Sequence, residues 1–325
     1  MLIHMGWLAL GAFAGMWTGC QSTPPDSKPA SVEVPKAPTG VATEPPRASL
    51  SLEEELKLKD YEAEVEVGRS MAGRLLQQFK PIQNKDLTAY VSTVGEVVAA
   101  QSPFRDRHFV FGILDTDTIN AFAMPGGYIF VTRGALAAVR SEAELAAILG
   151  HEIAHVGKRH IFNAMIIQSS QGRAGGEGED PSKVTVPQAV TARRRPASSS
   201  SATAETLAAV IGGGAGGSFK VLAAVQGGLG LLLDKGLDPK LEYEADREGV
   251  QYALAAGYEP RAMVEYFARV LSQKESQKTA ILSRTHPTLE TRIKGINASI
   301  AGTVPADYRG ALGEERFKAI VGRAF

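Results

Sequence analysis

Two histidines and a glutamate stand close together near the middle of the chain, in the order His151, Glu152 and His155. Residues four apart lie on one face of an α-helix, so the two imidazoles could bind one metal ion. Glu152 lies beside them, where its carboxylate could take a proton from a water molecule on that metal. The spacing predicts a hydrolytic zinc site, and an ordinary amphipathic helix that carries two histidines is the alternative until a third ligand is found.

The residues around this motif are those of a helical segment. Ser141 followed by Glu144 is a capping-box sequence, in which each side chain can bond the backbone N–H of the other. Good helix formers lead from there to the histidines. We expect helices from about Arg133 to about Ile167, with the motif inside them.

A later acidic segment offers the missing ligand. Glu242 and Asp246 are four residues apart near the start of another helical pattern, so they share a face. An oxygen of Glu242 would complete a His₂Glu set and leave a fourth position open for water. Asp246 could then accept the free ring N–H of a ligating histidine, most simply His151. The alternative is a charged helix face in solvent, which is where we expect Glu244 and Glu248.

The composition is that of a folded protein without a nucleic-acid partner. Of the 325 residues, 44% are hydrophobic, which is enough for a sizeable core. The 35 basic residues balance 35 acidic ones, so the chain lacks the basic surface of a nucleic-acid binder. Cys20 is the single cysteine, which excludes a disulfide framework and a cysteine-based zinc site within one chain.

The N-terminal residues 1–20 resemble a lipoprotein-type signal segment. A short apolar run ends in small residues before Cys20, which favours lipidation of that cysteine as the new N-terminus. The Pro-rich residues 21–49 follow as a linker. By resemblance to lipoprotein sorting, Gln21 indicates the outer membrane, so we expect a periplasmic bacterial protein anchored there by lipid. An ordinary or uncleaved signal with an incidental cysteine is the alternative.

The rest of the chain, residues 50–325, is expected to form one domain. Helical patterns cover residues 51–79 and 86–100. Short runs of β-branched and aromatic residues at 108–114 and 127–132 predict strands, separated by a Pro-Gly-Gly turn. These elements predict a mainly α fold with a small β-sheet, which is an α+β fold.

Two segments inside this domain have an unusual composition. Residues 168–206 are rich in glycine, serine and charge, which predicts a disordered insertion. Leu207–Leu233 is apolar and rich in glycine, but one membrane crossing there would place the two site helices on opposite sides of the bilayer. We therefore expect closely packed soluble helices, with a membrane-surface segment as the alternative.

Four motifs together resemble the zinc metallopeptidase family that includes the CAAX prenyl protease, HtpX and BepA. They are HEIAHVGKRH, EYEAD, the sequence NAFAMPGGYIFVTRG at 120–134, and Thr285-His286-Pro287 with Arg292 after it. They occur in the order of the family, and the soluble periplasmic lipoprotein branch is the most similar. The resemblance implies a gluzincin metallopeptidase domain with one Zn²⁺ per chain, bound by His151, His155 and Glu242, and catalysis by Glu152.

The resemblance also implies roles for neighbouring residues. Asn120 and Ala121 would belong to an edge strand whose backbone pairs with an extended substrate. His286 would be a catalytic residue that stabilises the oxyanion, or it would occupy the fourth zinc position and keep the enzyme latent. A surface histidine that caps a helix is the third possibility. His160 also matches the family but lies off the ligand face, so we expect it to pack in the core.

We therefore expect a zinc-dependent endopeptidase that cleaves unfolded or misassembled cell-envelope proteins. The rival hypothesis is a largely latent chaperone or assembly factor for such proteins, in which His286 occupies the fourth zinc position and closes the site. A zinc hydrolase of small molecules is disfavoured, because an edge strand suits peptides. The expected partners are protein or peptide substrates and, through the lipid, a membrane, whereas no oligomeric state is predicted.

Overall fold

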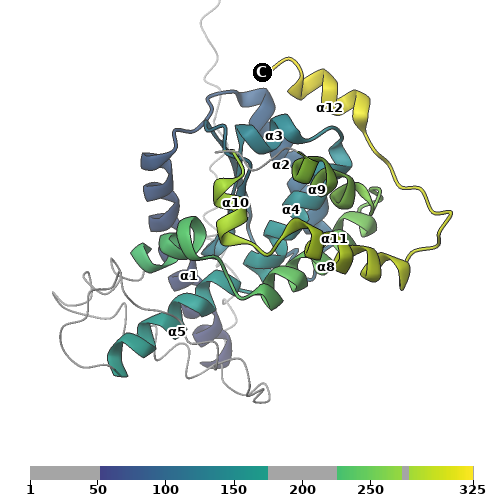
Figure 1. Ribbon diagram of the computed structural model, residues 1–325. Helices are drawn as coiled ribbons and strands as arrows, with labels where there is room; N and C mark the ends of the chain where they lie inside the picture. The colour runs from purple at the N-terminus through teal and green to yellow at the C-terminus, as the bar shows by residue number, and fades with distance from the viewer. Residues whose placement is uncertain (1–51, 175–224, 273–277, 325) are drawn as a thin grey trace, which may run out of the picture. The chain divides into compact units, whose positions relative to one another are not determined.

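Most of the described chain is helical, and a small sheet lies between the second and third helices in the sequence (Figure 1). The computed structural model describes residues 52–174, 225–272 and 278–324. The helices are α1 (Leu52–Gln78), α2 (Lys85–Ala100), α3 (Arg133–Ala138), α4 (Glu142–Gly157), α5 (His160–Ala174), α8 (Pro239–Ala255), α9 (Ala262–Ser272), α10 (Ala280–Thr285), α11 (Leu289–Ala301) and α12 (Glu314–Val321), with a π-helix at Leu231–Lys235. The predicted fold class, mainly α with a small sheet, is confirmed.

The sheet has three strands in the order β1-β3-β2. β1 (Val110–Leu114) pairs in parallel with β3 (Tyr128–Thr132), whereas β2 (Ala121–Met124) pairs antiparallel with β3. The Pro-Gly-Gly turn joins β2 to β3, and Gly126 has φ 74°, a left-handed conformation that glycine adopts without steric cost. Among the described strands β2 pairs on one side only, so it is an edge strand as predicted, but it begins at Ala121 and Asn120 lies just before it.

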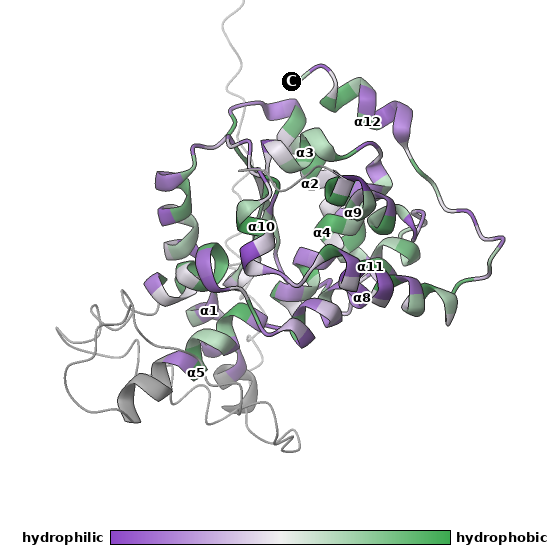
Figure 2. Cartoon of the chain, viewed as in Figure 1, coloured by the Kyte–Doolittle hydropathy of each residue, from purple (hydrophilic) through white to green (hydrophobic). Residues whose placement is uncertain are grey.

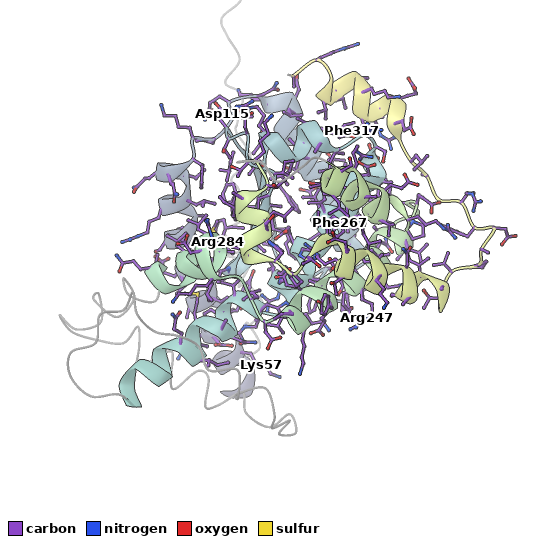
Figure 3. All side chains as sticks on the ribbon, viewed as in Figure 1. Lys57, Asp115, Arg247, Phe267, Arg284 and Phe317 are labelled. Atoms are coloured by element: carbon purple, nitrogen blue, oxygen red, sulfur yellow. The ribbon has the colours of Figure 1, made fainter. Side chains whose placement is uncertain are left out.

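The helix that carries the histidines, α4, is buried along its whole length. In Figure 2 it is mostly hydrophobic, and hydrophilic residues gather on the outer turns of the helices around it. Figure 3 shows the side chains of Lys57 and Arg247, which are exposed, on the outside of the helices. Because α4 is enclosed by other elements, the residues of its motif are held by tertiary packing as well as by helix geometry.

The N-terminus of α4 forms only half of the predicted capping box. The Ser141 hydroxyl accepts a hydrogen bond from the backbone N–H of Glu144 at 3.2 Å. The Glu144 carboxylate instead accepts from the backbone N–H of Arg140 at 2.8 Å. Both bonds satisfy donors near the helix start, so the helix begins at the predicted place although one partner differs.

α4 and α8 cross with their backbones in contact. A Cβ atom on Gly150 would lie 2.6 Å from the carbonyl oxygen of Gly249, and a Cβ on Gly249 would lie 2.4 Å from the backbone nitrogen of His151. Backbone atoms cannot approach a side chain so closely, so this crossing requires glycine in both helices. The short distance between the helices places the acidic start of α8 against the histidines of α4.

We expect Gly249→Ala to push α8 away from α4 and to weaken both folding and metal binding. Forcing a methyl group into a close-packed contact costs roughly 1–3 kcal/mol, and the better helix propensity of alanine offsets at most about 1 kcal/mol of it. Urea unfolding of the metal-free protein measures the stability, and competition with a chelator measures zinc affinity. Gly295→Ala is the matched control, since nothing lies within 4 Å of a Cβ added there. Equal zinc affinity of Gly249→Ala and wild type would contradict the role of this crossing.

The helical conformation is interrupted between α4 and α5. α4 ends at Gly157 and α5 begins at His160, because Arg159 takes φ 59°, a left-handed conformation that is uncommon outside glycine. Two carboxylates of α1 hold the Arg159 guanidinium in place, Asp60 at 2.5 Å and Glu64 at 2.9 Å. The break changes the direction of the chain directly after the histidine motif.

Some predicted segments differ or fall outside the described residues. α5 continues to Ala174, so it extends into the range 168–206 that composition assigns to a disordered insertion. The rest of that insertion lies outside the described residues, as do most of Leu207–Leu233, the signal segment 1–20 with Cys20, and the linker 21–49. Within the described ranges, no helix combines the length and the apolar character needed to cross a bilayer.

Candidate metal centre

The three residues predicted as ligands meet at one point. The Nε2 atoms of His151 and His155 lie 3.0 Å apart, and the Glu242 carboxylate lies 3.6 Å from the first and 3.5 Å from the second. Ligands of a tetrahedral zinc ion at about 2.0–2.1 Å are about 3.3 Å from one another. The three side chains therefore have the spacing of ligands to a single ion.

The environment of these side chains also fits a metal ion. All three are at least 95% buried, and Oε2 of Glu242 has no hydrogen-bond donor among the described residues. Leaving a buried carboxylate oxygen unsatisfied costs free energy, and a cation in the cluster would satisfy it. Burial lowers the pKa of His155 well below its usual value, so its ring is neutral, which is the form that binds a metal.

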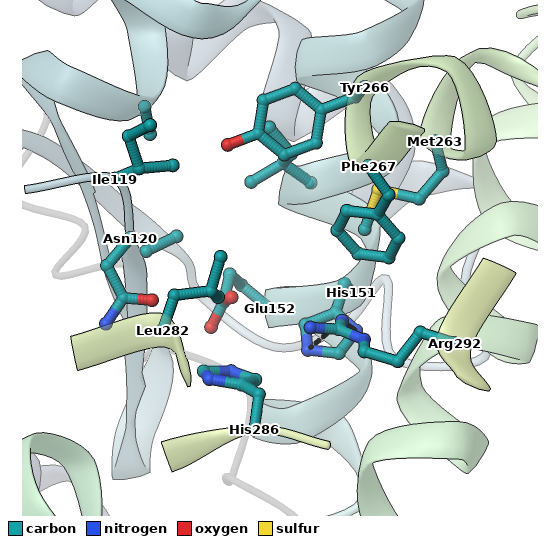
Figure 4. A pocket seen from close by; sticks show the side chains of 13 residues that line it. Ile119, Asn120, His151, Glu152, Met263, Tyr266, Phe267, Leu282, His286 and Arg292 are labelled. Atoms are coloured by element: carbon teal, nitrogen blue, oxygen red, sulfur yellow. Dashed lines mark hydrogen bonds between the residues drawn. The ribbon is translucent and has the colours of Figure 1, made fainter. Parts of the chain in front are cut away.

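Glu152 lies next to the ligand cluster and lines the pocket in front of it (Figure 4). Burial raises the pKa of Glu152 to about 7, and the charge of Glu242 adds to this effect while His151 opposes it. A carboxyl group with a pKa near neutrality can take up a proton and release it again. The position and the pKa of Glu152 therefore fit the predicted general base.

Asp246 contacts the Nδ1 side of the His151 ring, and Arg292 in turn binds Asp246. Asp246 Oδ1 lies 2.9 Å from Nδ1 of His151, the contact expected from the sequence. Arg292 of α11 donates to both oxygens of Asp246, at 2.6 and 2.9 Å, and its guanidinium lies 4.4 Å from the ring centre of Phe267. Although burial raises the pKa of Asp246, the charge of Arg292 outweighs it and holds that pKa well below its usual range.

Arg292 is the residue whose role was missed from the sequence. In the sequence it stands out only as the arginine that follows the Thr285-His286-Pro287 motif. In the structure it is 2% exposed and binds Asp246, which contacts His151. Its partner Asp246 is 46 residues earlier in the chain. The period of a helix or a strand does not relate positions so far apart. The one signal in the sequence is an arginine on an otherwise apolar helix face, which a buried position would require to be paired with an acidic residue.

His155 also has a partner on its other ring nitrogen. Nδ1 of His160 lies 2.9 Å from Nδ1 of His155, and Nε2 of His160 lies 3.5 Å from the Glu244 carboxylate. Lys158 binds the same carboxylate at 3.0 Å. His160 is buried, as expected for a packing residue, but it contacts a ligand as well. Glu244 is 31% exposed and pairs with Lys158, so it lies on a partly solvated, charged face of α8 and also contacts His160.

His286 lies at the end of α10 and faces the ligands. Its side chain is 13% exposed, and its Nε2 lies 3.5 Å from Oε2 of Glu242. The interpretation as a surface histidine is therefore wrong, even though its backbone forms the C-cap of α10. Burial lowers the pKa of His286 to about 4 against the opposing charge of Glu242, so the ring is neutral and able to bind a metal.

Comparison with known proteins identifies the family of this centre. Residues 85–300 match the family described as peptidase family M48. The chain belongs to peptidase family M48. The match confirms the resemblance to the metallopeptidase family that the sequence motifs indicated.

The M48 chain is similar to several proteins that are named as peptidases. It is 27% identical over 251 residues to the beta-barrel assembly-enhancing protease of Escherichia coli, covering 76% of this chain and 44% of that protein. The protein of the same name from Yersinia pestis is 27% identical over 250 residues, with the same coverage of 76% and 44%. The mitochondrial metalloendopeptidase OMA1 of Schizosaccharomyces pombe is 35% identical over 112 residues, which are 34% of this chain and 31% of OMA1. The chain thus spans less than half the length of these relatives.

Two small pockets of the M48 domain flank Glu152 along the edge strand. Asn120, just before β2, and Ala121, its first residue, line the first pocket, opposite His151 (Figure 4). Its apolar wall consists of Ile119, Ile148, Met263, Tyr266, Phe267 and Leu282. The second pocket shares Ala121, Glu152 and His286 with the first and has an apolar wall of Ile161, Leu231, Leu232 and Leu237. Both apolar pockets therefore include Glu152 and at least one residue of β2.

Proposed function

We propose that this chain is a zinc-dependent endopeptidase that cleaves unfolded or misassembled proteins of the bacterial cell envelope. The observation that carries the proposal is the convergence of His151, His155 and Glu242 beside Glu152, at the edge strand of the sheet. A zinc ion held by these three residues would supply Lewis-acid activation of water and of the scissile carbonyl.

The proton transfers of the reaction belong to Glu152. Its carboxylate accepts a proton from the attacking water and returns that proton to the nitrogen of the leaving amine. A pKa of about 7 suits both steps. Asp246, held by Arg292, keeps the His151 ring oriented with Nε2 toward the other ligands.

The edge strand and its pockets support polypeptide substrates. An extended segment can add to β2 through backbone hydrogen bonds, and Asn120 and Ala121 line one pocket together with Glu152. The flanking pockets would accept apolar side chains, which folded proteins bury. Both features select unfolded or looped segments over folded surfaces.

The cellular place of the enzyme is part of the proposal. The relatives named for enhancing β-barrel assembly support an envelope role, and a lipid on Cys20 would anchor the chain in the periplasm at the outer membrane. Labelling with radioactive palmitate tests the anchor, because wild type would incorporate label and Cys20→Ala would not.

His286 supports a second candidate, a largely latent assembly factor. Its neutral ring lies 3.5 Å from Glu242, close enough to occupy a fourth ligand position after a small movement. In that case the resting protein would bind envelope proteins along β2 without cutting them. In the peptidase itself, the same ring would stabilise the oxyanion.

Removal and return of zinc tests the proposed function. The full chain is incubated with a casein-like unfolded protein, before and after treatment with a zinc chelator. We expect one zinc per chain, cleavage that stops on chelation, and recovery when stoichiometric zinc is added, because the ion held by His151, His155 and Glu242 would supply the Lewis acid of the reaction.

His286→Ala separates the two candidates in the same assay. Cleavage by wild type supports the open peptidase, and cleavage by His286→Ala alone supports the latent form. Zinc bound to both proteins without any cleavage would overturn the peptidase and favour the assembly factor.

A further inference from the structure

The break after α4 places a third histidine beside a ligand. In an uninterrupted helix, a residue five positions after His155 would lie about 140° away around the axis. Because Arg159 has φ 59°, α5 starts in a new direction at His160. The two imidazole rings then meet edge to face, with ring centres 5.0 Å apart and the two Nδ1 atoms 2.9 Å apart.

The direction of the hydrogen bond between these rings follows from metal binding. A neutral His155 that binds a metal through Nε2 carries its proton on Nδ1. That N–H donates to Nδ1 of His160, which must accept and so carries its own proton on Nε2. Nε2 of His160 faces the Glu244 carboxylate at 3.5 Å, and Lys158 holds the other oxygen of that carboxylate at 3.0 Å.

We propose that His160 is a positioning residue of the zinc site, which fixes the tautomer and the ring orientation of His155. Glu244 and Lys158 fix His160 in turn. The inference rests on the proposed function, since it requires a metal at His155. Each ligating histidine then has its own support, Asp246 with Arg292 for His151 and His160 with Glu244 for His155.

The two supports differ in charge. Asp246 brings a negative charge that the buried Arg292 balances, whereas His160 is a neutral acceptor. Its carboxylate partner is 31% exposed and paired with Lys158, so solvent and the ammonium group screen that charge. His160 therefore orients His155 without adding a negative charge beside the ligand cluster, so a zinc ion held there would be a stronger Lewis acid.

Zinc affinity of the full chain, measured by competition with a chelator, tests this role. We expect His160→Leu to weaken zinc binding by roughly 10- to 100-fold. His160→Asn keeps an acceptor oxygen close to the position of Nδ1 and should stay within about threefold of wild type. His108→Asn changes an exposed histidine away from the site and should bind zinc as wild type does.

Two further measurements separate positioning from simple packing. If His160 only packs, His160→Leu lowers the stability of the metal-free protein in urea and leaves zinc affinity unchanged, which would overturn the proposal. Nitrogen NMR of the zinc-loaded protein should find the ring protons on Nδ1 of His155 and Nε2 of His160. A proton on Nδ1 of His160 would also overturn it. Absence of cleavage by zinc-loaded wild type would refute the proposed peptidase, but the zinc affinities would still decide the role of His160.

Discussion

Glu152→Gln is expected to slow peptide cleavage by roughly 100- to 10,000-fold while the protein keeps one zinc per chain. Glutamine has nearly the same shape but cannot take a proton from water, so the variant loses the general base and leaves the three ligands in place. Burial raises the pKa of Glu152 and so disfavours its charge, which means that a neutral side chain there should not destabilise the fold. Cleavage rates and zinc content of the same samples give the result.

The control for this variant is Glu96→Gln, which removes an exposed carboxylate on α2. It should retain the full rate. A Glu152→Gln protein that still cleaves an unfolded substrate would rule out the mechanism. A loss of zinc together with activity would instead place Glu152 among the groups that hold the metal.

Arg292→Leu is expected to have the largest effect on stability. The variant leaves the buried charge of Asp246 without its cation, and breaking a buried ion pair in this way costs roughly 3–5 kcal/mol. In the metal-free protein a protonated His151 would balance part of the negative charge of Asp246. Burial and Arg292 lower the pKa of His151, but the carboxylates of Asp246 and Glu242 outweigh them and raise it to about 9. Zinc binding needs the neutral ring, so a further loss should appear as weaker zinc affinity.

Urea unfolding without metal and chelator competition with zinc measure the two parts of this effect. Arg69→Leu is the matched control, since it breaks an ion pair to Glu66 whose side chains are 65% and 59% exposed. Because both side chains are exposed to solvent, it should leave the free energy of unfolding nearly unchanged. A loss for Arg292→Leu as small as that of the control would show that Asp246 does not depend on this arginine.

Helix geometry alone determined much of the centre. The spacing of His151 and His155 places both imidazoles on one helix face, and the spacing of Glu242 and Asp246 does the same in α8. The Ser141 cap and the turn with Gly126 are also local, since each depends on a few neighbouring residues. These features could be predicted because the period of one element sets which of its residues share a face.

Tertiary structure decided which faces meet. The backbone contact of Gly150 with Gly249 brings the two ligand helices together, and Arg292 arrives from a helix that no local pattern relates to Asp246. His160 was predicted to lie away from the ligands, and the left-handed Arg159 turns it toward His155. Ion pairs to α1, far away in the sequence, hold Arg159 in that conformation. Such contacts depend on long-range packing between elements, which the period of a single helix cannot encode.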